Sequence, residues 1–157
     1  MRITEESTFG PDVVAFLDAH VAQMRSISPP ESKHALDLDG LRRPGIAFWT
    51  VLDEEGALLG CGALAEIGPG HAELKSMRTD PARRRGGIAT ALLTHIVTEA
   101  RLRGHRRLSL ETGSDPFFAP ARALYAKHGF VPCPPFGSYR PDPLSTFMTL
   151  DLTASGG

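Results

Sequence analysis

The chain has 157 residues, a length that suits one compact domain. Its hydrophobic content of 41%, charged content of 22% and formal net charge of -1 are ordinary for a globular protein. A charge so close to zero argues against nucleic-acid binding or membrane-surface binding driven by the overall charge of the molecule.

The N-terminal residues MRITEESTFG include Glu5 and Glu6 and lack the apolar core of a secretory signal. No window approaches the ~20 consecutive apolar residues of a membrane-spanning helix. We therefore expect a cytoplasmic protein with a single domain over residues 1–153 and a flexible tail over residues 154–157. Cys61 and Cys133 form no CxxC pair, so we expect two free thiols and no metal site.

The predicted order of elements begins with a strand, which is followed by two predicted helices. An imperfect apolar stripe predicts a helix over Pro11–Arg25, with the proline in its first turn. Pro29 and Pro30 cannot continue that helix. A short second helix is predicted over Lys33–Leu41.

Three predicted strands follow. The apolar runs Ile46–Leu52 and Ala57–Ile67 flank Asp53-Glu54-Glu55-Gly56, which is typical of a β-hairpin. After the turn GPGH, residues Ala72–Thr79 predict a third strand.

A long amphipathic helix is predicted next, because apolar residues recur at spacings of three and four and Gly104 stands just past the end. Its apolar face consists of Ile88, Leu92, Leu93, Ile96, Val97 and Ala100. A strand over Arg106–Glu111, a helix over Phe117–Gly129 and a strand over Ser145–Leu152 complete the chain. This order predicts an α/β (α+β) protein with a mixed sheet and one strand–helix–strand crossover.

The turn before the long helix combines Arg83, Arg84 and Arg85 with Gly86 and Gly87. Free amides and the dipole at a helix N-terminus attract anions, glycines allow close approach, and arginine forks suit phosphate oxygens. The pattern predicts a diphosphate site, although an exposed basic turn capped by glycine would also explain it. Neither GxxxxGK[ST] nor GxGxxG is present, so the common nucleotide-binding loops are not indicated.

The pattern Arg84-x-x-Gly87-x-Ala89 resembles the R/Q-x-x-G-x-G/A signature of the GNAT family of N-acetyltransferases. The segment ARALYAKHGFV (Ala121–Val131) is similar to that family's later helix, and one strand, RRLSLET, separates the two blocks. The resemblance extends from about Ile46 to Leu152. The pieces SPPES, SLETG, PFGSY and STFM further resemble an uncharacterised bacterial subgroup of the family.

The resemblance implies a mostly antiparallel sheet flanked by helices, and acetyl-CoA as cosubstrate without a metal. It places the pyrophosphate on main-chain groups of the turn and helix start, namely Arg84, Arg85, Gly86, Gly87, Ile88, Ala89 and Thr90. Met77 and Thr79 would pair with the pantetheine arm like an added strand. Their strand is expected to bulge and splay from its neighbour, which opens a V-shaped cleft. Arg78 is expected either to face that cleft or to be an exposed residue at the strand end.

The resemblance also suggests catalytic residues for moving an acetyl group from a thioester to an amine. Glu73 is the candidate base, with Glu111 as the alternative, because the protonated amine must lose a proton. Tyr125 is the candidate acid for the leaving thiolate. The alternative to these catalytic roles is that the glutamates are ordinary surface residues and that Tyr125 is an ordinary core residue.

Glu31 and His34 are assigned to acceptor recognition, with Phe136 and Tyr139 on the other side of the pocket. The predicted function is an N-acetyltransferase that acts by direct transfer in a ternary complex, with a homodimer suggested by the resemblance. The acceptor amine stays open among small amines, amino acids, antibiotics and peptide lysines. A catalytically silent acyl-CoA sensor and an RNA-binding module that uses the arginines are the alternatives.

Overall fold

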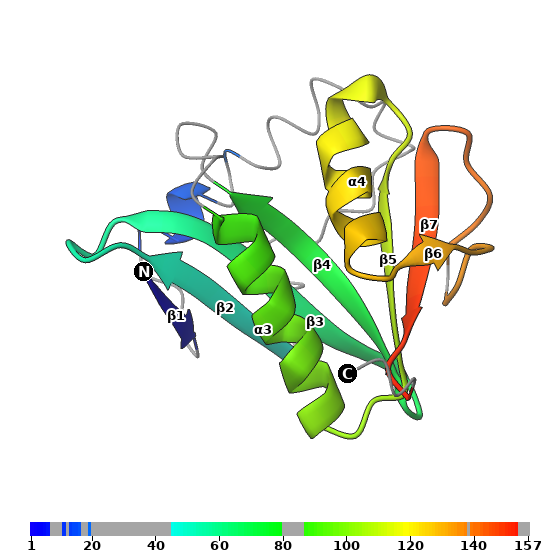
Figure 1. The fold of residues 1–157 in the computed structure, drawn as a ribbon, viewed down its shortest axis with the longest axis horizontal. Helices are drawn as coiled ribbons and strands as arrows, with labels where there is room; N and C mark the ends of the chain where they lie inside the picture. Colours follow the sequence, from blue (N-terminus) through cyan, green and yellow to red (C-terminus); the bar gives the residue numbers. More distant parts are fainter. Residues whose placement is uncertain are drawn as a thin grey trace.

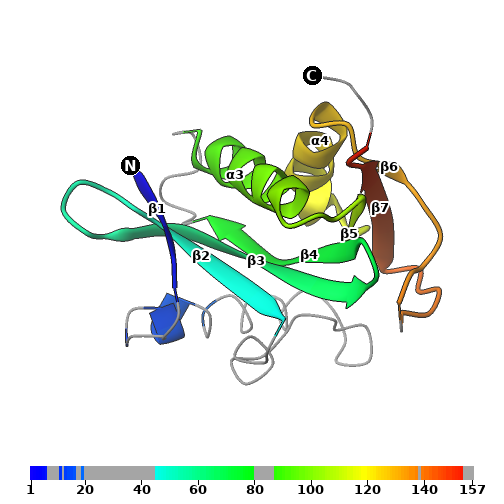
Figure 2. The same cartoon turned by 90° about the horizontal axis from the view of Figure 1, so that it is seen from below.

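The computed structural model describes residues 1–6, 11, 13–16, 19, 45–79, 87–137 and 139–153. In these ranges seven strands form one sheet in the order β1-β2-β3-β4-β5-β7-β6, and helices α3 and α4 lie on one of its faces (Figures 1 and 2). The strands are β1 (Arg2–Glu5), β2 (Ile46–Leu52), β3 (Leu58–Gly68), β4 (His71–Thr79), β5 (Arg107–Gly113), β6 (Val131–Pro132) and β7 (Ser145–Asp151). The helices are α3 (Ile88–Leu102), the single turn η3 (Pro116–Phe118) and α4 (Ala119–Lys127). The predicted mixed α/β fold is confirmed.

All neighbouring strands of the described sheet are antiparallel except β4 and β5. That parallel pair is joined by the crossover through α3, as the sequence predicted. The hairpin of β2 and β3 also forms where it was expected. The Asp53 carboxylate makes its turn by accepting the backbone N–H groups of Glu55 and Ala57 at 2.9 and 2.8 Å.

The face of the sheet under α3 forms the main core. All six predicted face residues of α3 are buried against apolar side chains of the sheet. Burying one such aliphatic side chain stabilises a fold by about 1.5–3 kcal/mol, so this interface holds α3 across the sheet.

Gly62 of β3 allows this close packing of α3. A Cβ at that position would lie 2.8 Å from Ile96 Cδ1 and 3.3 Å from Met77 Sδ. A side chain at this position would force Ile96 and Met77 to shift, so glycine lets the helix pack closely on the strand.

The N-terminal helix prediction is tested in part. Pro11, Val13–Phe16 and Ala19 are helical, and Val13 and Phe16 pack against Phe48 on the sheet face opposite α3 (Figure 2). The other residues of Pro11–Arg25, the predicted helix Lys33–Leu41 and the tail 154–157 lie outside the described residues.

The predicted single helix over Phe117–Gly129 is wrong in its limits. The Asp115 carboxylate accepts the Phe117 N–H at 2.8 Å and starts the separate turn η3, after which α4 begins at Ala119. Gly129, at φ 95°, ends α4 and directs the chain into β6, a short strand that the sequence did not predict. Pairing along β7 extends β5 to Gly113, two residues past its predicted end.

No helix in the described part of the chain is both long and apolar enough to cross a membrane.

Candidate functional site

Strands β4 and β5 pair at their beginnings and part before their ends. Residues 71–74 of β4 are in parallel register with residues 107–110 of β5, whereas β4 continues to Thr79 and β5 to Gly113 (Figure 1). We call the region in which β4 and β5 no longer pair with each other the fork. It consists of residues 75–79 of β4 and 111–113 of β5. The two strand edges that face each other there have no strand partner among the described residues. The predicted splaying of this strand is confirmed.

A β-bulge in β4 lies within the fork. Cys61 of β3 pairs with Arg78 and Ala63 pairs with Lys75, so two residues of β4 oppose the single residue Gly62. Ser76 has φ 55°, a conformation that a non-glycine residue rarely adopts and that bulges and functional sites accommodate. The expected bulge is therefore confirmed.

The bulge changes which way the following side chains point. Met77 packs with the core beneath α3, and Arg78 lies on the opposite face with its guanidinium carbon 5.4 Å from the centre of the Phe16 ring. Arg78 is thus a partly buried residue that stacks on an aromatic ring, and the alternative of an exposed residue at the strand end is wrong.

The start of α3 lies near the open end of the fork (Figure 1). Gly87 is the N-cap with φ 72°, and no described side chain caps the amides that follow it, those of Ile88, Ala89 and Thr90. The first turn contains no acidic residue that would compete for an anion. Arg84, Arg85 and Gly86 lie outside the described residues.

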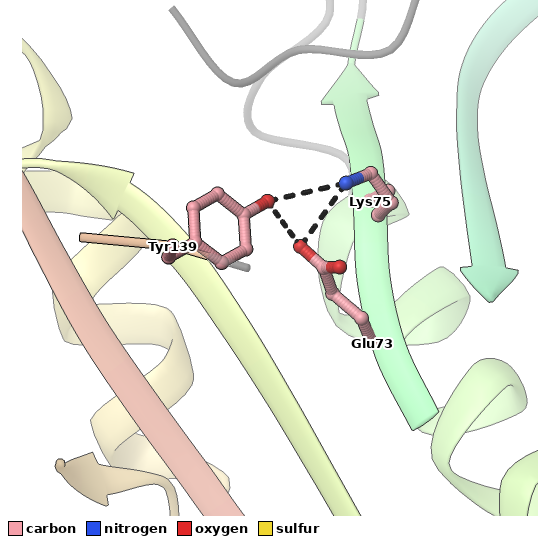
Figure 3. Close-up of polar contacts among 3 residues, drawn as sticks. All are labelled: Glu73, Lys75 and Tyr139. Carbon is pink, nitrogen blue, oxygen red and sulfur yellow. Dashed lines mark hydrogen bonds and ion pairs between the residues drawn. The ribbon is translucent and has the colours of Figure 1, made fainter. Parts of the chain in front are cut away.

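Glu73 is the central polar residue of the sheet face opposite α3. It is only 5% exposed, and its Oε2 accepts hydrogen bonds from the Tyr139 hydroxyl and from Lys75 Nζ, the latter at 3.2 Å. Lys75 Nζ also donates to the Tyr139 oxygen at 3.1 Å, so the three groups close a triangle (Figure 3). Burying a carboxylate is costly without such partners, and these two contacts offset that cost.

Glu111 is the first residue of β5 beyond its pairing with β4, and on its other side it pairs with Phe147 of β7. The pKa of its carboxyl is raised to about 7, chiefly by burial and to a lesser extent by the charges of Glu73 and Asp142, while Ser145 and Lys75 oppose the rise. The Glu111 charge in turn raises the pKa of Tyr139 on one sheet face and of Tyr125 on the α4 side. The charge of Glu111 therefore affects groups on both faces of the sheet, because Glu111 lies where β4 and β5 separate.

Tyr125 of α4 is buried, with its ring 5.7 Å from that of Phe130 in an edge arrangement. Burial and the Glu111 charge raise the pKa of its hydroxyl above the ordinary value, so the phenol keeps its proton at neutral pH. Tyr125 is part of the core, as the alternative explanation of this residue predicted, and it also lies close enough to Glu111 of the fork to be affected by its charge.

A second polar chain lies beside Glu73. His71 Nε2 and Ser109 Oγ are 2.7 Å apart, Ser109 Oγ and Thr149 Oγ1 are 2.9 Å apart, and Arg107 donates to Thr149 at 3.0 Å. These contacts satisfy one another and hold β4, β5 and β7 in register. The described residues contain no group of three or more His, Cys, Asp or Glu side chains placed to hold a metal ion.

The structure thus brings Glu73, Glu111 and Tyr125 together around one fork, whereas Glu31 and His34 lie outside the described residues. Sequence reasoning missed Lys75, although a residue two positions from Glu73 on a strand must share its face. It placed Tyr139 beside the acceptor but did not predict its hydrogen bond to Glu73.

Known proteins share the sequence features that surround this site. The family model described as Acetyltransferase (GNAT) family matches residues 13–130. The chain belongs to the GNAT acetyltransferase family.

Relatives and solved structures that match nearly the whole chain support this membership. YsnE of Bacillus subtilis (strain 168), named an uncharacterized N-acetyltransferase, is 48% identical over 152 residues, which is 97% of this chain and 100% of YsnE. The IAA acetyltransferase of Azospirillum brasilense is 42% identical over 153 residues, 97% of this chain and 98% of its own. The crystal structure of a candidate acyl-CoA N-acyltransferase from Klebsiella pneumoniae has a TM-score of 0.81 at 29% identity and covers 96% of this chain and 97% of its own.

The GNAT family transfers acyl groups from acetyl-CoA, so this protein is an acetyl-CoA-dependent N-acetyltransferase. The fork and the start of α3 are the candidate site of this activity.

Proposed function

We propose that this GNAT enzyme transfers the acetyl group of acetyl-CoA to a primary amine of a small molecule or peptide by direct attack in a ternary complex. The observation that carries this proposal is the fork itself. Its open strand edges, the uncapped start of α3 and two glutamates lie around one region of the protein.

The residues at the fork fit the coenzyme. The unpaired edge of β4 around Met77, Arg78 and Thr79 offers main-chain groups to an extended amide-containing arm in the manner of an added strand. The amides that follow Gly87 suit a diphosphate, because they are uncapped and the helix dipole favours an anion there. When bound, acetyl-CoA supplies an activated thioester. Arg84, Arg85 and Gly86 would complete the diphosphate site.

The glutamates Glu73 and Glu111 would prepare the acceptor. A protonated amine must bind and lose a proton before its nitrogen forms a bond with the acetyl carbon and the carbon–sulfur bond breaks. The two carboxylates supply an anion for the ammonium and an acceptor for the proton.

Tyr125 would donate the proton that the departing sulfur takes up. Its raised pKa keeps the hydroxyl protonated at neutral pH. Glu111 lies close enough to affect that pKa and would pass a proton from the amine to the Tyr125 oxygen. The ammonium loses two protons as it becomes an amide nitrogen. The first passes through Glu111 to solvent before the attack, and the second leaves nitrogen after the attack and replaces the proton that Tyr125 gives to the thiol.

Direct transfer is favoured over an acetyl-cysteine intermediate. Burial raises the pKa of the Cys61 thiol to about 12, and burial also raises that of Cys133. Neither thiol is prepared as a nucleophile, because the thiolate is the reactive form.

The test is a screen of amines in which release of the free thiol of CoA is followed, with IAA tested alongside them because of the Azospirillum relative's name. With an active amine, initial rates are then measured while both substrates are varied. Intersecting double-reciprocal lines are expected for a ternary complex. Parallel lines, or acetylated protein trapped in the absence of acceptor, would overturn direct transfer.

A further inference from the structure

Tyr139 approaches Glu73 from a distant part of the chain. It lies in the connection between β6 and β7, 66 residues after Glu73, and β7 pairs with β5 and β6 rather than with β4. Its ring centre lies 5.5 Å from that of Phe147 and 5.1 Å from that of Phe136, which fixes the ring beside β7. The hydroxyl therefore reaches across β5 to a carboxylate on β4 (Figure 3).

This arrangement treats the two oxygens of Glu73 differently. Oε2 accepts from both Tyr139 and Lys75, and hydrogen bonds of this kind are strongest to a charged carboxylate. Oε1 has no hydrogen bond to either of these residues. A carboxylate held as an anion with one oxygen already engaged is suited to bind a cation through the other oxygen.

Glu111 has the opposite character. The two donors beside Glu73 do not hydrogen-bond Glu111, and its pKa of about 7 suits a group that gains and loses a proton near neutrality. The charge of Glu73 is one of the causes of that value, so fixing Glu73 as an anion also makes Glu111 a better proton acceptor.

We propose that Tyr139 and Lys75 are positioning residues that hold Glu73 as the anion that binds the acceptor's ammonium group, and that Glu111 removes the proton. This assignment rests on the proposed function and extends it to the class of acceptor. The site selects alkylamines, which are charged at neutral pH, over arylamines and alcohols, which are neutral there. Within the described part of the chain, the charged and titratable groups that face Glu73 are Lys75 and His71 on β4, Glu111 on β5 and Tyr139.

The test compares Glu73→Gln, Glu111→Gln and Tyr139→Phe on an alkylamine and an arylamine of similar size. Glu73→Gln should raise KM for the alkylamine by about tenfold or more and change KM for the arylamine much less, since a hydrogen bond to a charged group is lost. Tyr139→Phe keeps the ring that packs on Phe147 and should raise the alkylamine KM by about tenfold, with kcat within about threefold of wild type. Glu111→Gln should instead lower kcat and leave the alkylamine KM nearly unchanged.

Thr146→Val is the matched control, because it removes one hydroxyl of β7 that pairs with Ser114 at 2.9 Å, away from Glu73. Urea unfolding and the Kd for CoA, measured for each variant, establish that fold and coenzyme site persist. The inference is overturned if Glu73→Gln lowers kcat without changing either KM, or if Tyr139→Phe affects both amines equally. A wild-type enzyme that acetylates no amine would instead refute the proposed function.

Discussion

Replacing Glu111 with Gln should make the protein more stable at alkaline pH while it makes the enzyme less active. Glu111 is mostly buried in the fork, and its pKa rises from 4.5 to about 7 chiefly because burial disfavours the charged form. Folding above that pH therefore forces a charge into an unfavourable place. The amide of glutamine has nearly the same shape and carries no charge.

The size and sign of the effect follow from the two pKa values. Below about 4.5 the carboxyl is protonated in both the folded and the unfolded chain, so it has no pH-dependent effect. Between 4.5 and about 7 only the unfolded chain ionises, so wild-type stability falls as pH rises. Each pKa unit corresponds to about 1.4 kcal/mol, so the full penalty above pH 7 is about 3.5 kcal/mol at most.

The assay is urea unfolding of wild type and Glu111→Gln at pH 5 and pH 8. The free energy of unfolding of the variant relative to wild type should increase by about 2 kcal/mol between these pH values, and kcat at pH 8 should fall by about 10²–10⁴-fold. Glu66→Gln, at an exposed position of β3, is the control and should show no such change. A stability difference that is the same at both pH values would refute the argument from burial.

Three further substitutions test other parts of the structure. Tyr125→Phe should lower kcat by about 10–100-fold and change the free energy of unfolding by less than about 1 kcal/mol, because the buried ring is kept; unchanged thiol release would remove its role as acid. Gly62→Ala should destabilise the fold by about 1–3 kcal/mol in urea unfolding, since its Cβ would lie 2.8 Å from Ile96 Cδ1, and a neutral result would contradict that packing. Gly87→Ala should cost about 1 kcal/mol in urea unfolding, because φ is 72°, and should weaken CoA binding in calorimetry; wild-type values for both would argue against this turn as the diphosphate site.

The helix and strand predictions succeeded where local rules apply. The apolar face of α3 was predicted residue by residue, because a helical repeat buries positions three and four apart against any apolar sheet. The turn after β2 was predicted because Asp53 and Gly56 have local conformational preferences. The limits of α4 were missed, since Asp115 starts a separate turn that competes with the helix for the same residues.

The candidate site was predicted only in part. Glu73, Glu111 and Tyr125 were chosen from a family resemblance, and the structure places them around one fork. Lys75 and the Tyr139 contact were missed. The contact joins residues far apart in the chain, and no periodicity indicates which loop will pass over which strand.

The sequence by itself determined the order of the longer helices and strands, the buried face of α3 and the family signature, because these depend on residues close together in the chain. Tertiary structure decided where β4 and β5 separate, which oxygen of Glu73 is engaged and why Glu111 titrates near neutrality. The physical reason is that burial and charge–charge interaction depend on distances across the sheet, and strand register together with side-chain packing sets those distances only after the chain has folded.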